Sequence, residues 1–385
     1  MTSHPTADLS SMRVDLVGSL LRPPQLKEAF ARWGRGEASD QELQSVQDQA
    51  IREVIGKQEA HRLPIVVDGE FRRSNFMESF SVVAGVEEWQ AGVKSYHHVL
   101  ARKDTDGKSE KGQDPILLNR KRVTQKLRLV RNRLLEDYRF ARNLTQRPVK
   151  VTLIGADRIT QCFDSENSRA VYPTVDEFVA DVVVVEREML AQLAAEGCRY
   201  VGIDGPGYTA YIDASSLAAM RARGEDPQAN MERSIEADNQ VIAESPRVTF
   251  GIHLCRGNRQ SMWHREGSYD AIAERLFNGL NHSRLLLEYD TERAGSFEPL
   301  RFVPKGKTVV LGLITTKTGR LETVDELRRR IDAAARYIPL EQLALSPQCG
   351  FASSIMGNLL SEDEQFRKLD VMIETAEKIW GGQLI

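Results

Sequence analysis

Four side chains that can bind a divalent metal stand at the ends of short apolar segments in the second half of the chain. His253 and Cys255 lie two residues apart at the end of VTFGIHLC, Glu288 follows three leucines, and Cys349 comes shortly after LALS. Residues two apart in a strand point to the same face, so the first two share a side. Zinc accepts imidazole nitrogen, thiolate sulfur and carboxylate oxygen in tetrahedral sites. The pattern predicts Zn²⁺ bound by His253, Cys255, Glu288 and Cys349.

Taken singly, each of these residues has a plainer explanation. A lone Cys is usually a small buried hydrophobe, which is the role we expect for Cys162 and Cys198. A carboxylate that ends an apolar strand is harder to explain in this way, because burying it without a partner is costly. The metal prediction therefore depends on the joint placement of the four residues at neighbouring strand ends.

The elements that must position these residues form a repeating pattern. Eight short runs lack strict polar alternation, as expected for strands buried on both faces of a parallel sheet, and helical patterns separate them. The expected strands are Asp15–Gly18, Ile65–Asp68, Val149–Leu153, Tyr200–Ile203, Val248–His253, Arg284–Glu288, Thr308–Leu313 and Leu343–Ser346. The pattern predicts an α/β fold, a (β/α)8 TIM-like barrel, with an open doubly wound sheet as the alternative. We expect residues 1–385 to form a single catalytic barrel, spanning about 14–380.

Three helix starts carry the spacing of a capping box, in which a Ser or Thr precedes a Glu by three residues. These pairs predict helices that begin after Thr174, Thr323 and Ser361.

One segment does not fit the repeat. About eighty residues separate the second strand from the third, where a barrel needs only a helix and two loops. We expect an inserted basic helical excursion at about 90–147. Between residues 120 and 147 it carries ten Lys or Arg against one Glu and one Asp. A solvated helical face or a basic lid over an anionic ligand would both explain this charge, so the role of 120–147 stays open.

The composition excludes several classes of protein. Across 385 residues, 52 Lys and Arg stand against 55 Asp and Glu, so the net charge of -3 gives no reason to expect nucleic acid or a membrane surface as partner. No apolar run approaches the ~18 residues of a spanning helix. The N-terminus shows no secretory signal, and four cysteines cannot be a disulfide framework. We therefore expect a cytoplasmic protein.

The segments HLCRGN, LLLEYD and SPQCGF resemble the zinc motifs of the catalytic barrel of cobalamin-independent methionine synthase. The resemblance runs from about Val14 to Trp380 and matches the C-terminal barrel alone, as in the short single-barrel "core" branch of the family. It implies zinc on the same four residues, in the same chain order.

The resemblance also implies a site for the amino acid substrate. Val17-Gly18-Ser19 resembles the family's I-G-S turn, which implies that Ser19 holds this substrate. Asp68-Gly69-Glu70 and Ile203-Asp204-Gly205-Pro206 resemble its G-E and I-D-E-P motifs, which implies that Glu70 and Asp204 bind the ammonium group. As strand-end residues, all three could instead cap the following helix.

Three departures from the family pattern bear on the methyl donor. Gly205 replaces a Glu, Gln161-Cys162-Phe163 lacks the Trp that stacks on folate, and Ile314–Lys317 lacks the family's D-I-H-S histidine. The candidate donor-side residues are Asp157, Thr316 and Lys317. The short branch includes core methionine synthases, believed to use a methylated corrinoid, and a coenzyme M transferase that acts on epoxides. The donor thus stays open between methyltetrahydrofolate and methylcobalamin, with a corrinoid protein as a conceivable partner.

The expected chemistry is thiol activation. A free thiol with a pKa near ~8.5 is mostly protonated at neutral pH, whereas a thiol bound to zinc ionises. We expect a zinc-dependent S-methyltransferase acting on small molecules, with homocysteine as acceptor and methionine as product. One alternative is a zinc alkyltransferase of the same barrel that uses another thiol or electrophile, such as an epoxide or a methylated xenobiotic. The other is a non-catalytic zinc- or corrinoid-binding barrel. The sequence also leaves a homo-oligomer open.

Overall fold

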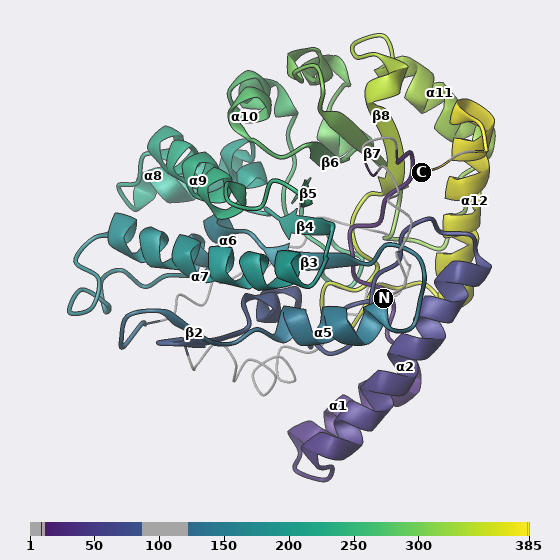
Figure 1. Cartoon of the computed structure of the whole chain (residues 1–385). Helices are drawn as coiled ribbons and strands as arrows, with labels where there is room; N and C mark the ends of the chain where they lie inside the picture. The colour runs from purple at the N-terminus through teal and green to yellow at the C-terminus, as the bar shows by residue number, and fades with distance from the viewer. Residues whose placement is uncertain (1–8, 10–11, 87–121, 383, 385) are drawn as a thin grey trace.

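Six parallel strands form the centre of the molecule. The computed structural model describes residues 9, 12–86, 122–382 and 384. The strands follow one another in chain order, each bonded to the next. They are β3 (Lys150–Ile154), β4 (Tyr200–Asp204), β5 (Thr249–Leu254), β6 (Arg284–Glu288), β7 (Thr308–Ile314) and β8 (Leu343–Pro347). Figure 1 shows helices arranged around these strands, in the architecture of a TIM-like β/α barrel, as the sequence predicts.

The prediction was wrong in detail for the first two strands. The segments Asp15–Gly18 and Ile65–Asp68 form no ladder, and each region contributes a single parallel bridge. Val14 pairs with a residue of β8, and Val66 pairs with the residue just before β3. The two segments therefore take the two remaining barrel positions, one at each edge of the six-stranded sheet.

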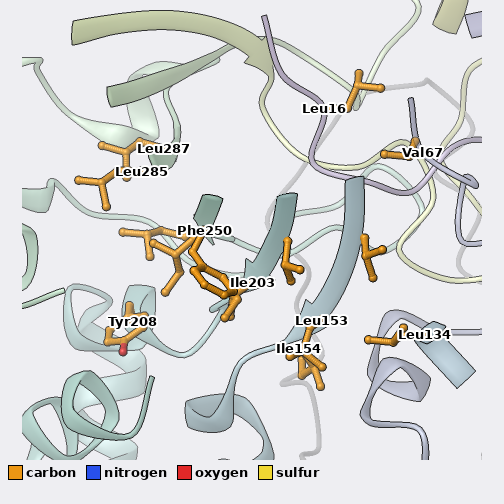
Figure 2. Packing of buried hydrophobic residues seen from close by; sticks show 14 of the residues in the cluster. Leu16, Val67, Leu134, Leu153, Ile154, Ile203, Tyr208, Phe250, Leu285 and Leu287 are labelled. Carbon is orange, nitrogen blue, oxygen red and sulfur yellow. The ribbon is translucent and has the colours of Figure 1, made fainter. Parts of the chain in front are cut away.

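Side chains explain why the pairing of each segment does not extend beyond a single bridge. Gln58 donates to the carbonyl of Val67 at 2.8 Å and accepts from its N–H at 3.0 Å. Lys150 Nζ donates to the carbonyl of Leu16. Backbone groups that a neighbouring strand would use are thus satisfied by side chains. Leu16 and Val67 still pack in the same apolar cluster as the strand residues Leu153 and Ile203 (Figure 2).

The helices begin at the predicted caps. Thr323 and Ser361 each form a reciprocal capping box with a Glu three residues later, and the Thr174 side chain accepts from the N–H of Glu177. The α-helices are α1 (Pro24–Gly34), α2 (Asp40–Ala60), α5 (Arg133–Arg142), α6 (Ala156–Gln161), α7 (Val175–Ala195), α8 (Ala214–Ala222), α9 (Pro227–Ile242), α10 (Ala273–Gly279), α11 (Val324–Ala334) and α12 (Glu362–Trp380). Short 3-10 helices lie at η2 (Phe76–Phe80), η3 (Tyr208–Tyr211), η4 (Tyr269–Ala271), η5 (Glu292–Ala294), η6 (Glu298–Phe302) and η7 (Leu340–Gln342).

The predicted excursion at 90–147 is described only from residue 122 onward; its residues 90–121 lie outside the described part. Here β2 (Arg128–Arg131) pairs antiparallel with β1 (Val82–Ala84), and α5 packs against α7. Several basic side chains meet acidic partners, with Arg131–Glu136 at 2.6 Å and Arg139–Glu196 at 2.7 Å. In the described part, these pairs favour a solvated helical face over a lid. The single catalytic unit with an insertion stays a prediction.

The amino ends of the strands enclose a buried ionic network. Lys150 Nζ lies 2.9 Å from Asp15 Oδ1, Arg284 Nε lies 3.1 Å from Asp15 Oδ2, and the Tyr200 hydroxyl also donates to Asp15. Burial alone would raise the pKa of Asp15, but the two cations outweigh it and hold that pKa below its usual value. Above the network, Leu286, Val310 and Ala344 fill the barrel interior.

This network predicts the effect of removing its only carboxylate. Asp15→Ala would leave Lys150 and Arg284 buried without their counter-charge, so we expect the free energy of unfolding to fall by about 3–5 kcal/mol. Urea denaturation measures the loss. The matched control Asp332→Ala removes an exposed carboxylate of an i,i+4 pair and should change little. Equal stability of the two variants would contradict this role for Asp15.

Candidate active site

The four predicted zinc ligands converge where β5, β6 and β8 end. One ligand atom from each of His253, Cys255, Glu288 and Cys349 lies within 4.8 Å of the others. Cys255 Sγ lies 3.6 Å from Cys349 Sγ, and His253 Nε2 lies 3.8 Å from Glu288 Oε1. Metal bonds of about 2.0–2.3 Å give a tetrahedron with edges of roughly 3.3–3.8 Å. The spacing therefore fits one zinc ion.

Strand geometry brings these residues together. His253 stands two positions after Gly251 in β5, and Glu288 stands two positions after Leu286 in β6. Leu286 belongs to the apolar cluster inside the barrel. Because side chains two apart share a face, His253 and Glu288 also face the interior, one layer nearer the carboxyl ends.

Hydrogen bonds orient the imidazole and one thiol. His253 Nδ1 lies 3.3 Å from the carbonyl oxygen of Leu286, and its Nε2 has no hydrogen-bond partner among the described residues. With its proton on Nδ1, the ring donates to that carbonyl and presents the Nε2 lone pair to the cluster, the arrangement typical of metal-binding histidines. The N–H of Gly257 donates to Cys255 Sγ at 3.3 Å.

Three donors hold the carboxylate of Glu288. The N–H of Arg256 donates to Oε1 at 2.7 Å, while Arg293 and Gln348 donate to Oε2 at 2.9 and 3.1 Å. Burial alone would raise the pKa of Glu288, but Arg293, Lys317 and His253 outweigh it and keep that pKa below its usual value. Glu288 is therefore held as an anion, which is the form that binds a metal.

The protonation of the other ligands also fits a cation. The hydrogen bond with Cys349 and then burial raise the pKa of Cys255 well above its usual value. Burial lowers the pKa of His253, yet its contact with Cys255 and the nearby carboxylates of Asp204 and Glu288 raise it to about 9. Without a metal this anionic cluster retains protons. A divalent cation would replace them, so the donor set suits zinc.

Two predicted substrate residues line a narrow cavity beside the cluster. Glu70, Asp204 and the zinc-ligand candidate His253 share a cavity of about 20 Å³, room for about one water. Glu70 Oε2 and Asp204 Oδ1 are buried and have no hydrogen-bond partner among the described residues. Burial raises the pKa of Asp204 to about 6. Two unpaired buried acceptors call for a donor, and an ammonium group would satisfy both.

Ser19 lies against the loop that carries Cys349. Its hydroxyl accepts from the N–H of Ala352 at 3.3 Å, and its carbonyl accepts from the N–H of Phe351 at 2.9 Å. A Cβ at Gly350 would lie 2.0 Å from Ser19 Oγ, so only glycine allows this approach. The contact ties the first barrel segment to the metal cluster.

The three donor-side candidates are not together. Asp157 accepts from Ser234 of α9 at 2.5 Å, away from the cluster. Thr316 donates to Gln348 Oε1 at 2.7 Å and so reaches Glu288 through that residue. Lys317 Nζ donates to the carbonyl of Gly257 at 2.8 Å and so supports the loop after Cys255.

Sequence reasoning missed Arg293 and Gln348, which hold Glu288. Gln348 stands next to the predicted ligand Cys349 in SPQCG, and this position could have indicated a role at the site. Arg293 has no comparable signal, because its contact with Glu288 depends on the turn between them.

Comparison with known proteins identifies the family of this chain. Residues 13–378 match the family described as cobalamin-independent synthase, catalytic domain. The uncharacterized protein YxjH of Bacillus subtilis (strain 168) is 36% identical over 377 residues, 96% of this chain and 94% of the relative. A methionine synthase of Pyrococcus abyssi is 24% identical over 95% of this chain and 92% of its own length. A Listeria monocytogenes structure, described as a candidate vitamin-B12-independent methionine synthase, has a TM-score of 0.75 and 25% identity, covering 97% of this chain and all of that one.

The chain belongs to the cobalamin-independent synthase catalytic-domain family. It is a methionine-synthase-like methyltransferase with a TIM-like barrel. Among the helices of the described residues, none has the length and apolarity needed to cross a membrane.

The cluster predicts the effect of losing one sulfur. Cys349→Ser replaces a thiolate with a hydroxyl, a much weaker zinc ligand, so bound zinc should fall from about one per chain to well below that value. Elemental analysis of the dialysed protein measures it. In the control Cys198→Ser, a buried thiol outside the cluster is replaced, and zinc content should not change. Full zinc content in Cys349→Ser would contradict the assignment.

Proposed function

We propose that this protein methylates the thiol of homocysteine to form methionine, with zinc bound by His253, Cys255, Glu288 and Cys349. The observation that supports this proposal is the position of His253, which belongs to the metal cluster and also lines the cavity of Glu70 and Asp204. One small molecule could therefore place its thiol at the metal ligands and its ammonium group at the two carboxylates. A molecule with both groups is an amino thiol.

The residues divide the work between the two ends of the substrate. Glu70 and Asp204 bind the ammonium group, and Ser19 holds the amino acid portion beside the Cys349 loop. Bound zinc would supply the Lewis acidity that keeps a thiol ionised at neutral pH. Arg293 and Gln348 hold Glu288 in place. The substrate thiol gives its proton to water, and its sulfur forms a bond to the methyl carbon. The bond from that carbon to the donor breaks, and its electron pair stays on the donor.

A second candidate is transfer to another thiol or from another electrophile, and one contact favours keeping it. Phe163 ends the segment in which the family Trp is missing, and its ring stacks on Phe178 at 3.9 Å between ring centroids. This ring serves core packing, so the segment offers no aromatic platform for folate. The missing platform keeps another electrophile open as the second candidate, while the proposal itself names methyltetrahydrofolate and methylcobalamin as donors. The cytoplasmic location stays a prediction.

A donor-by-thiol screen tests the proposal. Zinc-loaded protein should methylate homocysteine in the presence of methyltetrahydrofolate or methylcobalamin, and methionine is measured by mass spectrometry. Coenzyme M is the comparison thiol and an epoxide the comparison electrophile. Because its sulfonate would meet the two carboxylates, coenzyme M should react much more slowly. Faster alkylation of coenzyme M than of homocysteine would contradict the amino thiol and favour the second candidate.

The ammonium pocket gives a separate prediction. Glu70→Gln and Asp204→Asn should each raise the KM for homocysteine about tenfold or more, because each removes a buried counter-charge. In the parent protein kcat/KM for homocysteine should rise with pH through about 6, where Asp204 ionises, and Asp204→Asn should lose this rise. The control is Glu186→Gln, which changes a buried carboxyl on α7 outside the pocket. Burial raises the pKa of Glu186 well above its usual value, so this group is neutral like Gln, and the variant should leave the KM for homocysteine unchanged. An unchanged KM in both pocket variants would refute this role.

A further inference from the structure

A second, larger cavity shares no lining residue with the cavity of Glu70 and Asp204. It has a volume of about 460 Å³ and is bounded mainly by the residues that follow β6, the residues that follow β7, and α11. Arg293 and Lys317 line it. The same Arg293 donates to the Glu288 carboxylate at 2.9 Å, so this cavity adjoins the proposed zinc site.

The charged groups of this cavity are unbalanced. Five cationic side chains and three carboxylates line it. The carboxylates already have partners: Asp290 pairs with Arg293 at 2.7 Å, Glu326 with Arg320 at 3.2 Å, and Glu322 with Lys368, from outside the cavity, at 2.9 Å. The cationic lining residues are Arg293, Lys317, Arg320, Arg329 and Arg330.

Two of these cations are held by neutral groups. Lys317 Nζ donates to the Gly257 carbonyl at 2.8 Å and to the Asn258 side-chain oxygen at 2.7 Å. Arg330 donates to the carbonyls of Tyr289 and Asp290. Carbonyl oxygens fix the positions of these two side chains without forming an ion pair with them. Such fixed cations around a cavity suit an anion, because little side-chain ordering has to accompany binding.

We propose that this cavity binds the anionic group of the methyl donor, a carboxylate or a phosphate, with Arg330, Arg329 and Lys317 as its ligands. The inference depends on the proposed methyl transfer and adds the chemical class of its second substrate. Trp263 also lines the cavity, and the Arg293 guanidinium lies over its ring, 5.5 Å from the ring centroid.

Titration calorimetry of the zinc-loaded protein with two simple anions tests the site. Glutarate stands for the carboxylates of a folate glutamate tail, and inorganic phosphate stands for the phosphodiester of a corrinoid. We expect saturable binding of at least one, and the preferred anion indicates the source. Arg330→Gln and Arg329→Gln should each weaken that binding about tenfold. Arg329 is exposed, so its variant should fold even if Arg330→Gln does not. The matched control Arg328→Gln, on α11 but outside the cavity, should bind as the parent does.

Steady-state kinetics connects the cavity to the donor. Arg329→Gln should raise the KM for the methyl donor and leave the KM for homocysteine unchanged. Absence of saturable anion binding, or equal binding by the parent and both cavity variants, overturns the inference and leaves the transfer assay to judge the proposed function separately. Equal changes in both KM values overturn the assignment to the donor. Anion binding without methyl transfer from any donor overturns the proposed function.

Discussion

Removing a carboxylate, an imidazole and two thiols from water is costly, and the bonds that offset this cost organise the carboxyl end of the barrel. An ionised carboxylate without partners is not stable in such a place. Glu288 is fully buried and accepts from Arg256, Arg293 and Gln348, which follow β5, β6 and β8 respectively. One carboxylate therefore fixes three loops, and two of those loops carry the proposed cysteine ligands. The hydrogen bonds that stabilise the buried charge of Glu288 thus also position the loops of the site.

At the amino end of the barrel, two glycines make room for buried charged and polar side chains. Lys150 and Tyr200 extend across the interior to reach Asp15, and their side chains occupy the space beside the next strand. A Cβ at Gly202 would lie 2.6 Å from Lys150 Cε, and one at Gly251 would lie 2.8 Å from the Tyr200 hydroxyl. Glycine at these two positions lets the ionic network form beneath the cavity. Because Lys150, Arg284 and Tyr200 all bond to Asp15, the network fixes the floor of the barrel.

The sequence predicted what depends on local pattern. Period-two alternation placed His253 and Cys255 on one face, and short apolar runs located β3 to β8 closely. The same runs failed at Asp15–Gly18 and Ile65–Asp68, because side chains outside the runs satisfy their backbone groups. Gln58, which bonds to Val67, is nine residues away, whereas Lys150 is 134 residues from Leu16. Arg293 could not be found for a related reason, since its part in holding Glu288 exists only after the chain turns. The roles of Ser19, Glu70 and Asp204 came from family resemblance, and their function is still a prediction.

The two cavities share no lining residue, and this separation bears on how a methyl group would be transferred. Two residues after β3 contact the surrounding helices. Asp157 accepts a hydrogen bond from Ser234 of α9, and Phe163 stacks on Phe178 of α7. The cationic cavity instead adjoins β6 and β7, and Arg293 stands between it and Glu288. An amino thiol held at Glu70 and Asp204 would approach from the side of β3 and β4, while an anionic donor would approach from the side of β6 and β7. Transfer of a methyl group requires its donor and its acceptor on opposite sides of the carbon. Two separate cavities would provide that arrangement without moving the barrel, because one is lined by His253 and the other by Arg293, which holds Glu288.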